Sequence, residues 1–149
     1  MKLSALDVEQ QTLEGQTMSR LRLYNERECA TPDSVCLPGF TLLDRRFRTM
    51  ISKLRCGTLP LAIETGRYRS IPRDQRLCRS CESGAVEDEL HFIFDCIKYE
   101  DIRRNILNDI MPEESITDYK FCIKFMMNDI NRSKKLATYL IEAFRKRQL

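Results

Sequence analysis

The sequence predicts a mostly α-helical fold, in which a small helical domain carries an irregular, turn-rich segment of cysteines and one histidine between its helices. Two observations predict it. Apolar residues recur at the three- and four-residue spacing of a helical face at about residues 41–57, 99–111 and 115–147. Between the first two stretches, prolines and glycines interrupt any periodicity, and cysteines surround the only histidine of the chain. With 149 residues, the chain can form one domain with a substantial core.

The N-terminal part differs from the rest. Residues 1–38 are polar and lack a helical pattern, and Pro32 and Pro38 interrupt any long helix there. We expect this stretch to be a loosely ordered N-terminal segment. Residues 39–149 are expected to form a single helical domain, with its metal site within 73–98.

The first helix of that domain is predicted to begin near Thr41, because Thr41 and Asp44 resemble a capping box, and to stop at Gly57. Its apolar face consists of Leu43, Phe47, Met50, Ile51 and Leu54. Residues 58–77 lack helical periodicity. We therefore expect an extended, turn-rich connection that carries three apolar side chains inward, namely Leu59, Leu61 and Ile63.

Three further helices follow the cysteine-rich segment. One is expected over about 99–111, a second begins at the caps Ser115 and Asp118, and the last covers 132–147. The second helix has apolar residues at helical spacing at Tyr119, Cys122, Ile123, Met126 and Ile130. The last helix has them at Leu136, Leu140, Ile141 and Phe144. We expect the Met and Phe side chains of these helices to pack in the core.

The most specific motif consists of Cys78, Cys81, His91 and Cys96, which form a C-x-x-C pair and an H-x-x-x-x-C pair. Three cysteines and one histidine in two close pairs are a common ligand set for one structural Zn²⁺ ion. His91 is expected to project from a helix that opens with acidic residues and loosens near Asp95, so that Cys96 lies at its end. Four protein ligands would leave no open position for a substrate, which is typical of a structural site.

Two alternatives for these cysteines stay open. The three thiols and His91 could be ordinary buried core residues, because free cysteine often packs as a small hydrophobe. Disulfides are less favoured, because the seven cysteines are an odd number and no secretory signal precedes them. Asp7 and Glu9 lie where the apolar core of a signal would be. The sequence therefore predicts an intracellular protein, nuclear or cytoplasmic and not secreted.

Charge is distributed unevenly along the chain. The net charge is +3, but residues 45–79 carry ten basic and two acidic side chains, while 82–118 carry three basic and eleven acidic ones. Arginine suits phosphate recognition, and an aromatic ring can stack on bases. The candidate nucleic-acid-binding residues are Arg55, Arg67, Tyr68, Arg69, Arg73, Arg76 and Arg79. In the alternative interpretation, these arginines pair with the neighbouring acidic block inside the fold.

Several functions are not supported by the sequence. Catalysis with a nucleophile would need His91 as its base, in competition with metal binding. Neither a GxxxxGK[ST] phosphate loop nor a GxGxxG fingerprint is present. No apolar run reaches the roughly 20 residues of a membrane span. We expect no enzymatic activity, no small-molecule substrate and no membrane partner.

Four motifs stand together in residues 54–96: Leu54–Gly57, Ile63–Tyr68, Arg76–Cys81, and the run Val86–Glu89 followed by His91, Phe92 and Cys96. Together they resemble the zinc-binding CCHC segment near the C-terminal end of non-LTR (LINE-type) retrotransposon reverse transcriptases, here as a stand-alone derivative. The resemblance implies zinc on Cys78, Cys81, His91 and Cys96, and a domain that handles element RNA or target DNA. It does not imply polymerase activity, because the aromatic-x-Asp-Asp run is absent. Many members have proline after the last cysteine, whereas Ile97 here gives the helix no reason to stop.

The sequence thus predicts a non-catalytic zinc-binding domain that binds RNA or DNA through the basic region 45–79. The alternative is a zinc-stabilised protein-interaction or structural module without nucleic-acid binding. A third interpretation is a decayed element fragment with no present function.

Overall fold

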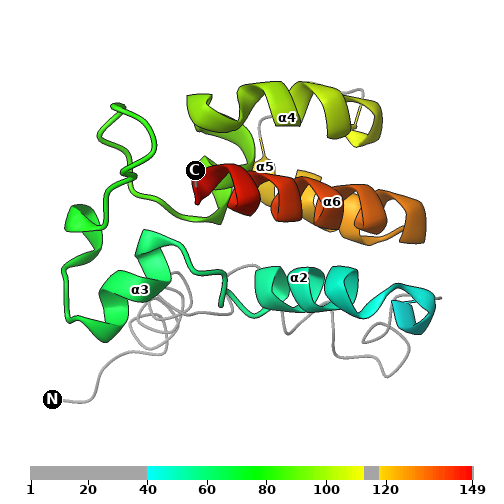
Figure 1. Ribbon diagram of the computed structural model, residues 1–149, viewed down its shortest axis with the longest axis horizontal. Coiled ribbons are helices and arrows are strands. Elements are labelled where there is room, and N and C mark those ends of the chain that lie inside the picture. Colours follow the sequence, from blue (N-terminus) through cyan, green and yellow to red (C-terminus); the bar gives the residue numbers. More distant parts are fainter. Residues whose placement is uncertain (1–39, 113–117, 149) are drawn as a thin grey trace, which may run out of the picture.

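The computed structural model describes residues 40–112 and 118–148, and within these ranges the fold is mostly α-helical, as predicted (Figure 1). The expectations for residues 1–38 and for the cap at Ser115 lie outside the described residues. The only extended pairing in the described ranges is an isolated antiparallel bridge between Leu77 and Val86. The helices are α2 (Arg45–Arg55), α3 (Ala62–Tyr68), α4 (Glu100–Ile106), α5 (Tyr119–Met127) and α6 (Ile130–Arg147).

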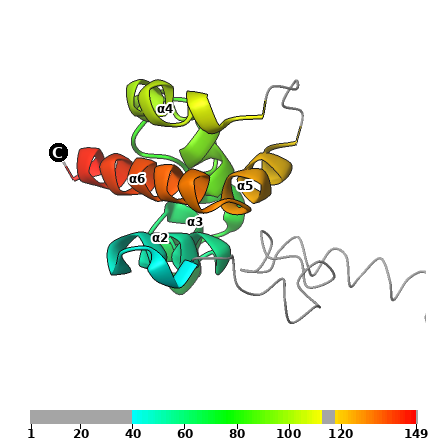
Figure 2. The ribbon, with the colours of Figure 1, turned by 90° about the vertical axis from the view of Figure 1, so that its right-hand side faces the viewer.

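Helix α6 is the centre of the fold. It packs against α2, α4 and α5, and Figures 1 and 2 show α4 and α2 on opposite sides of it. A helix covered from several sides needs apolar residues around much of its circumference. Helix α6 meets this need with Leu136, Ala137, Tyr139, Leu140 and Ala143, all of which are fully buried.

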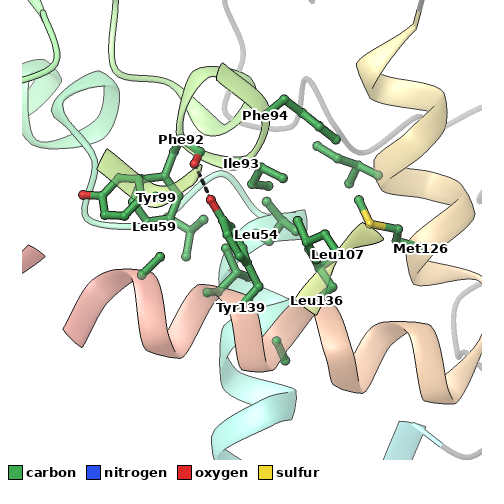
Figure 3. Close-up of a cluster of buried hydrophobic side chains, with 14 of the residues drawn as sticks. Leu54, Leu59, Phe92, Ile93, Phe94, Tyr99, Leu107, Met126, Leu136 and Tyr139 are labelled. Carbon is green, nitrogen blue, oxygen red and sulfur yellow. Dashed lines mark hydrogen bonds between the residues drawn. The ribbon is translucent and has the colours of Figure 1, made fainter. Parts of the chain in front are cut away.

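An aromatic cluster connects α6 to the segment that carries His91. The ring of Phe92 lies with its centroid 4.7 Å from that of Tyr99 and 4.8 Å from that of Phe144. Tyr139 meets the same ring edge-on, at 6.4 Å. Figure 3 shows Phe92, Tyr99 and Tyr139 beside the aliphatic core. The segment that carries His91 is therefore built into the core of the domain.

The predicted apolar face and C-terminal end of helix α2 are confirmed, but the predicted start of the helix was wrong. Gly57 follows the helix with φ of +61°, and its N–H donates to the carbonyl of Leu54 (3.1 Å). The N-cap is Asp44, without a side-chain hydrogen bond, whereas Thr41 belongs to a separate 3₁₀ turn, Phe40–Leu42. A capping box at Thr41 does not form because the chain passes through this turn before the helix begins.

The prediction that 58–77 lacks a helix was also wrong, because α3 lies within it. Leu59 and Leu61 are fully buried, as expected. Gly66 allows Arg76 to cross the helix: a Cβ at Gly66 would lie 2.7 Å from Cγ of Arg76. With only seven residues, α3 is too short to show a periodic pattern and depends on such tertiary contacts.

The C-terminal half follows the predicted order with shifted boundaries. Helix α4 ends at Ile106, and the 3₁₀ turn Asn108–Ile110 completes the stretch predicted as one helix. Helix α5 stops at Met127 and does not reach Ile130, because Asp129 caps α6 and accepts hydrogen bonds from two of its first N–H groups. Asp118 caps α5 in the same way, as predicted. The expectation that every Phe is in the core fails at Phe121, which is 57% exposed.

Candidate metal centre

The first pair of candidate ligands lies on a narrow loop over residues 76–87. The two ends of this loop run antiparallel: the N–H of Cys78 donates to the carbonyl of Ala85 (2.8 Å), and the N–H of Glu87 donates to that of Arg76 (2.9 Å). Gly84, with φ of +66°, turns the chain in a conformation that other residues rarely adopt. The loop therefore holds Cys78 at its base and Cys81 at its turn.

The second pair lies on a wide helical turn. Residues His91–Asp95 form a π-helical turn, and the N–H of Cys96 donates across it to the carbonyl of His91 (2.8 Å). The side chain of Asp88 caps the segment by accepting the N–H of His91 (3.0 Å). The five-residue width of the turn brings Cys96 back to the same side as His91, which is the loosening expected near Asp95.

Ile97 does not extend this helix, contrary to the expectation from the missing proline. Cys96 has extended backbone angles, with φ of −64° and ψ of 118°. A separate 3₁₀ turn, Ile97–Tyr99, follows it and leads into α4. The wide turn ends the helical segment without proline, because its closing hydrogen bond directs the chain away from the helix axis.

The four side chains converge on one point. Their candidate ligand atoms all lie within 4.8 Å of one another. The two closest pairs are the Sγ atoms of Cys78 and Cys96, 3.9 Å apart, and Sγ of Cys81 with Nε2 of His91, 3.3 Å apart. All the described cysteines are free thiols. The residues predicted as metal ligands therefore lie close enough together to bind one metal ion.

Without a bound cation, burial keeps two of the three thiols protonated. Burial raises the pKa of Cys96 to about 12 and also raises the pKa of Cys78 above its ordinary value. Burial opposes ionisation of Cys81 too, but hydrogen bonds, first of all from Ser83, lower its pKa to about 6. The Oγ of Ser83 lies 3.0 Å from that Sγ atom. Two buried thiols ionise at neutral pH only if a metal ion replaces their protons.

Two residues that the sequence did not indicate hold the π turn in place. The hydroxyl of Tyr139 on α6 donates to the carbonyl of Phe92 (2.7 Å), as Figure 3 shows. The guanidinium of Arg103 on α4 donates to the carbonyls of Ile93 (2.7 Å) and Cys96 (2.9 Å). These bonds satisfy carbonyls that a regular helix would have paired internally. The backbone that carries His91 and Cys96 is thus fixed by two other helices.

Glu87 is the other unexpected residue of the site. It was predicted as part of an acidic helix start, but it is 1% exposed and precedes the helical residues of this segment, which begin at Glu89. Its Oε2 accepts the N–H of Ala62, at the start of α3 (2.7 Å), and the guanidinium of Arg147 at the end of α6 (2.9 Å). Its Oε1 lies 3.9 Å from Sγ of Cys78. One buried carboxylate therefore joins the metal centre to two helices.

The candidate nucleic-acid residues divide into two groups. Arg76 donates to the carbonyls of Ile63 and Ile71, both at 2.8 Å, and so serves the fold. Arg73 forms an ion pair with Asp88 (3.5 Å), which agrees with the alternative interpretation for this arginine, whereas Arg67 pairs with Glu64 (3.0 Å), three residues before it and outside the acidic block. The others are half-buried or exposed: Arg55 is half-buried, while Tyr68, Arg69 and Arg79 are exposed.

A further basic surface lies on α2, outside the predicted residues. A shallow concavity on this helix is lined by basic and hydroxyl side chains, among them Arg45, Arg48, Thr49, Ser52 and Lys53. These positions recur at helical spacing on the face of α2 opposite the core.

Among the described residues, no helix combines the length and apolar character needed to cross a lipid bilayer.

No family model, curated protein or solved structure matches this chain.

Proposed function

We propose that this chain is a non-catalytic zinc-binding domain that binds RNA or DNA through the basic region 45–79. The observation that carries the metal assignment is the convergence of Cys78, Cys81, His91 and Cys96. Zinc prefers sulfur and nitrogen ligands at tetrahedral corners, and bonds of about 2.3 Å place two such sulfurs about 3.8 Å apart. The 3.9 Å between Cys78 and Cys96 fits that separation.

The donor set supports a structural role for the ion. Four protein ligands complete a tetrahedral site, whereas catalytic zinc keeps one position for water or substrate. Three of the four residues, Cys78, His91 and Cys96, are buried. Zinc would fix the loop over residues 76–87 against the π turn and so keep the adjacent arginines in a constant arrangement.

Nucleic-acid binding is supported by the exposed cations that remain after internal pairing. Arg69 and Arg79 are exposed, and so is Tyr68, which precedes Arg69 and is 71% exposed, with the guanidinium of Arg67 5.4 Å from the centroid of its ring. The concavity on α2 adds Arg45 and Lys53 on the same basic stretch of the chain. Phosphate groups bind such surfaces mainly through charge.

A second candidate function, a zinc-stabilised interaction or structural module, is favoured by a specific observation. Arg67, Arg73 and Arg76, three of the seven predicted nucleic-acid residues, contact internal partners. In that case the remaining arginines only solubilise the surface.

Salt dependence distinguishes the two functions. Full-length, zinc-loaded protein is titrated with a labelled RNA and a DNA of equal length at several salt concentrations. Phosphate binding predicts that log affinity falls linearly with log salt, and that the double variant Arg69→Ala/Arg79→Ala reduces the slope by about one per lost contact. Arg104→Ala, an exposed arginine on α4, is the matched control and is expected to leave the slope unchanged. Absence of binding at low salt would favour the interaction module.

The retrotransposon origin is also part of this proposal. It is supported by the four motifs of residues 54–96, whose two metal-binding pairs converge in space.

A further inference from the structure

Helix α5 exposes an aromatic surface that the metal centre does not use. One face of the helix is buried through Cys122, Ile123 and Met126. Phe121 lies off that face and is 57% exposed. Phe125, one turn later, stacks with it, with ring centroids 6.3 Å apart and an interplanar angle of 28°. The two stacked rings thus form one apolar surface, which is open to solvent at Phe121.

Cations surround this aromatic pair. The guanidinium of Arg132, from the first turn of α6, lies 4.0 Å from the centroid of Phe125, and its Nε is buried without a hydrogen-bond partner. Lys120 precedes Phe121 and is exposed, and Lys124 is one turn away on the same helix.

The acidic side chains at the starts of α5 and α6 act as helix caps. Asp118 and Asp129 point their carboxylates at the first N–H groups of α5 and α6. Residues 119–149 together carry eight basic and two acidic side chains. The surface around Phe121 is therefore both aromatic and positively charged.

We propose that Phe121 stacks on an unpaired base, so that the ligand of this domain is single-stranded RNA or DNA. The inference rests on the proposed nucleic-acid function and specifies the class of ligand. Every base has an aromatic face, and cations beside the ring attract the phosphates that flank it. The bases of a duplex stack on one another and offer a free face only at the ends. An exposed ring among cations thus selects single strands.

Apart from Tyr68, which belongs to the basic region 45–79, the other exposed large apolar side chains of the described residues are aliphatic. Leu42 and Ile97 are more exposed, but they are aliphatic and cannot stack on a base. A protein partner would bind Phe121 by its apolar area, and leucine would then replace it well. A base needs the ring itself, so leucine would not replace it.

The experiment uses the full-length, zinc-loaded protein and two probes, a thymine-rich single strand with one 2-aminopurine and a duplex of equal length. The variants are Phe121→Ala, Phe121→Leu and Phe121→Trp, with Leu42→Ala as the control for loss of an exposed apolar side chain. We expect Phe121→Ala and Phe121→Leu to weaken single-strand binding by roughly 5- to 100-fold and to abolish the quenching of 2-aminopurine fluorescence. Phe121→Trp and Leu42→Ala should bind as the original protein does, and duplex binding should change little.

Each other outcome overturns the inference. If Phe121→Leu binds single strands normally while Arg69→Ala/Arg79→Ala weakens binding, Phe121 does not stack and the proposed function stands. If the original protein binds neither probe at low salt, the proposed function and this inference fail together. If sedimentation shows self-association that Phe121→Ala abolishes without nucleic acid, the surface binds protein instead.

Discussion

Tyr139→Phe is expected to weaken the metal centre, although residue 139 is not a ligand. The variant removes one hydroxyl, which donates to the carbonyl of Phe92 at 2.7 Å, and keeps the ring. Both residues are fully buried, so water cannot replace the lost donor. The carbonyl lies in the π turn between His91 and Cys96, and an unpaired carbonyl there favours relaxation of the turn.

The structure sets the size of the effect. Leaving a buried acceptor unpaired costs about 1–3 kcal/mol. In a domain of this size the loss lowers the melting temperature by roughly 5–15 °C. The metal-loaded protein needs the turn closed, whereas the metal-free protein can relax it. A difference of about 1.4 kcal/mol between the two forms would reduce metal affinity roughly tenfold.

The assay combines urea unfolding, with and without zinc, with competition against a chromophoric chelator. Tyr119→Phe is the matched control, because its hydroxyl donates to the side chain of Asp95 on the exposed side of the same turn (3.0 Å). That variant should change stability by less than about 0.5 kcal/mol. Equal destabilisation of Tyr139→Phe in both forms, with unchanged zinc affinity, would refute the idea that Tyr139 positions the ligands.

The same hydroxyl gives a pH dependence. Burial raises the pKa of Tyr139 above its ordinary value of 10.0. Below pH 10 the hydroxyl of Tyr139 keeps its proton in both the folded and the unfolded chain. Its full contribution to the free energy of unfolding is therefore present there. Above pH 10 the unfolded chain loses this proton first, and stability falls by up to about 1.4 kcal/mol per pH unit. The unfolding free energy of Tyr139→Phe should therefore decline less steeply between pH 10 and 11, and parallel declines would contradict the assignment.

Three further changes test other parts of the structure. Native mass spectrometry should detect one bound zinc ion in the original protein and in Cys122→Ser, a change at a buried thiol outside the cluster, but none in Cys96→Ser. Glu87→Gln keeps the size of the side chain but removes its charge, and should cost about 1–3 kcal/mol in urea unfolding; an unchanged midpoint would show that the carboxylate is not needed. Gly66→Ala should displace Arg76 and lower the melting temperature despite the better helix propensity of alanine, so a rise would show that the close contact relaxes freely.

The cluster of candidate ligands and most helices could be predicted because their signals are local. The spacing of Cys78, Cys81, His91 and Cys96 is readable in 19 consecutive residues, and each long helix repeats its apolar pattern over several turns. Helix α3 was missed because seven residues hold too little of such a pattern. Its stability depends on contacts made by residues elsewhere in the chain.

The supporting residues could not be predicted because their partners are distant in the sequence. Tyr139 lies 47 residues from Phe92, and Arg147 lies 60 residues from Glu87. Nothing in the local pattern of an acidic run separates a solvated helix start from a buried carboxylate such as Glu87. Likewise, composition alone could not separate Arg76, which bonds to internal carbonyls, from the exposed Arg79.

The uneven burial of the four candidate ligands would affect how fast a bound metal ion exchanges. Cys78, His91 and Cys96 are buried among the helices, while Cys81 is half-buried at the turn of its loop. Nothing would contact a Cβ at the nearby Gly84 within 4 Å, so no other part of the described structure packs on this side of the turn. If a metal ion is bound here, an incoming chelator would reach it beside Cys81 first. The buried ligands would then set the affinity for the ion, and opening of the turn that carries Cys81 would set its residence time.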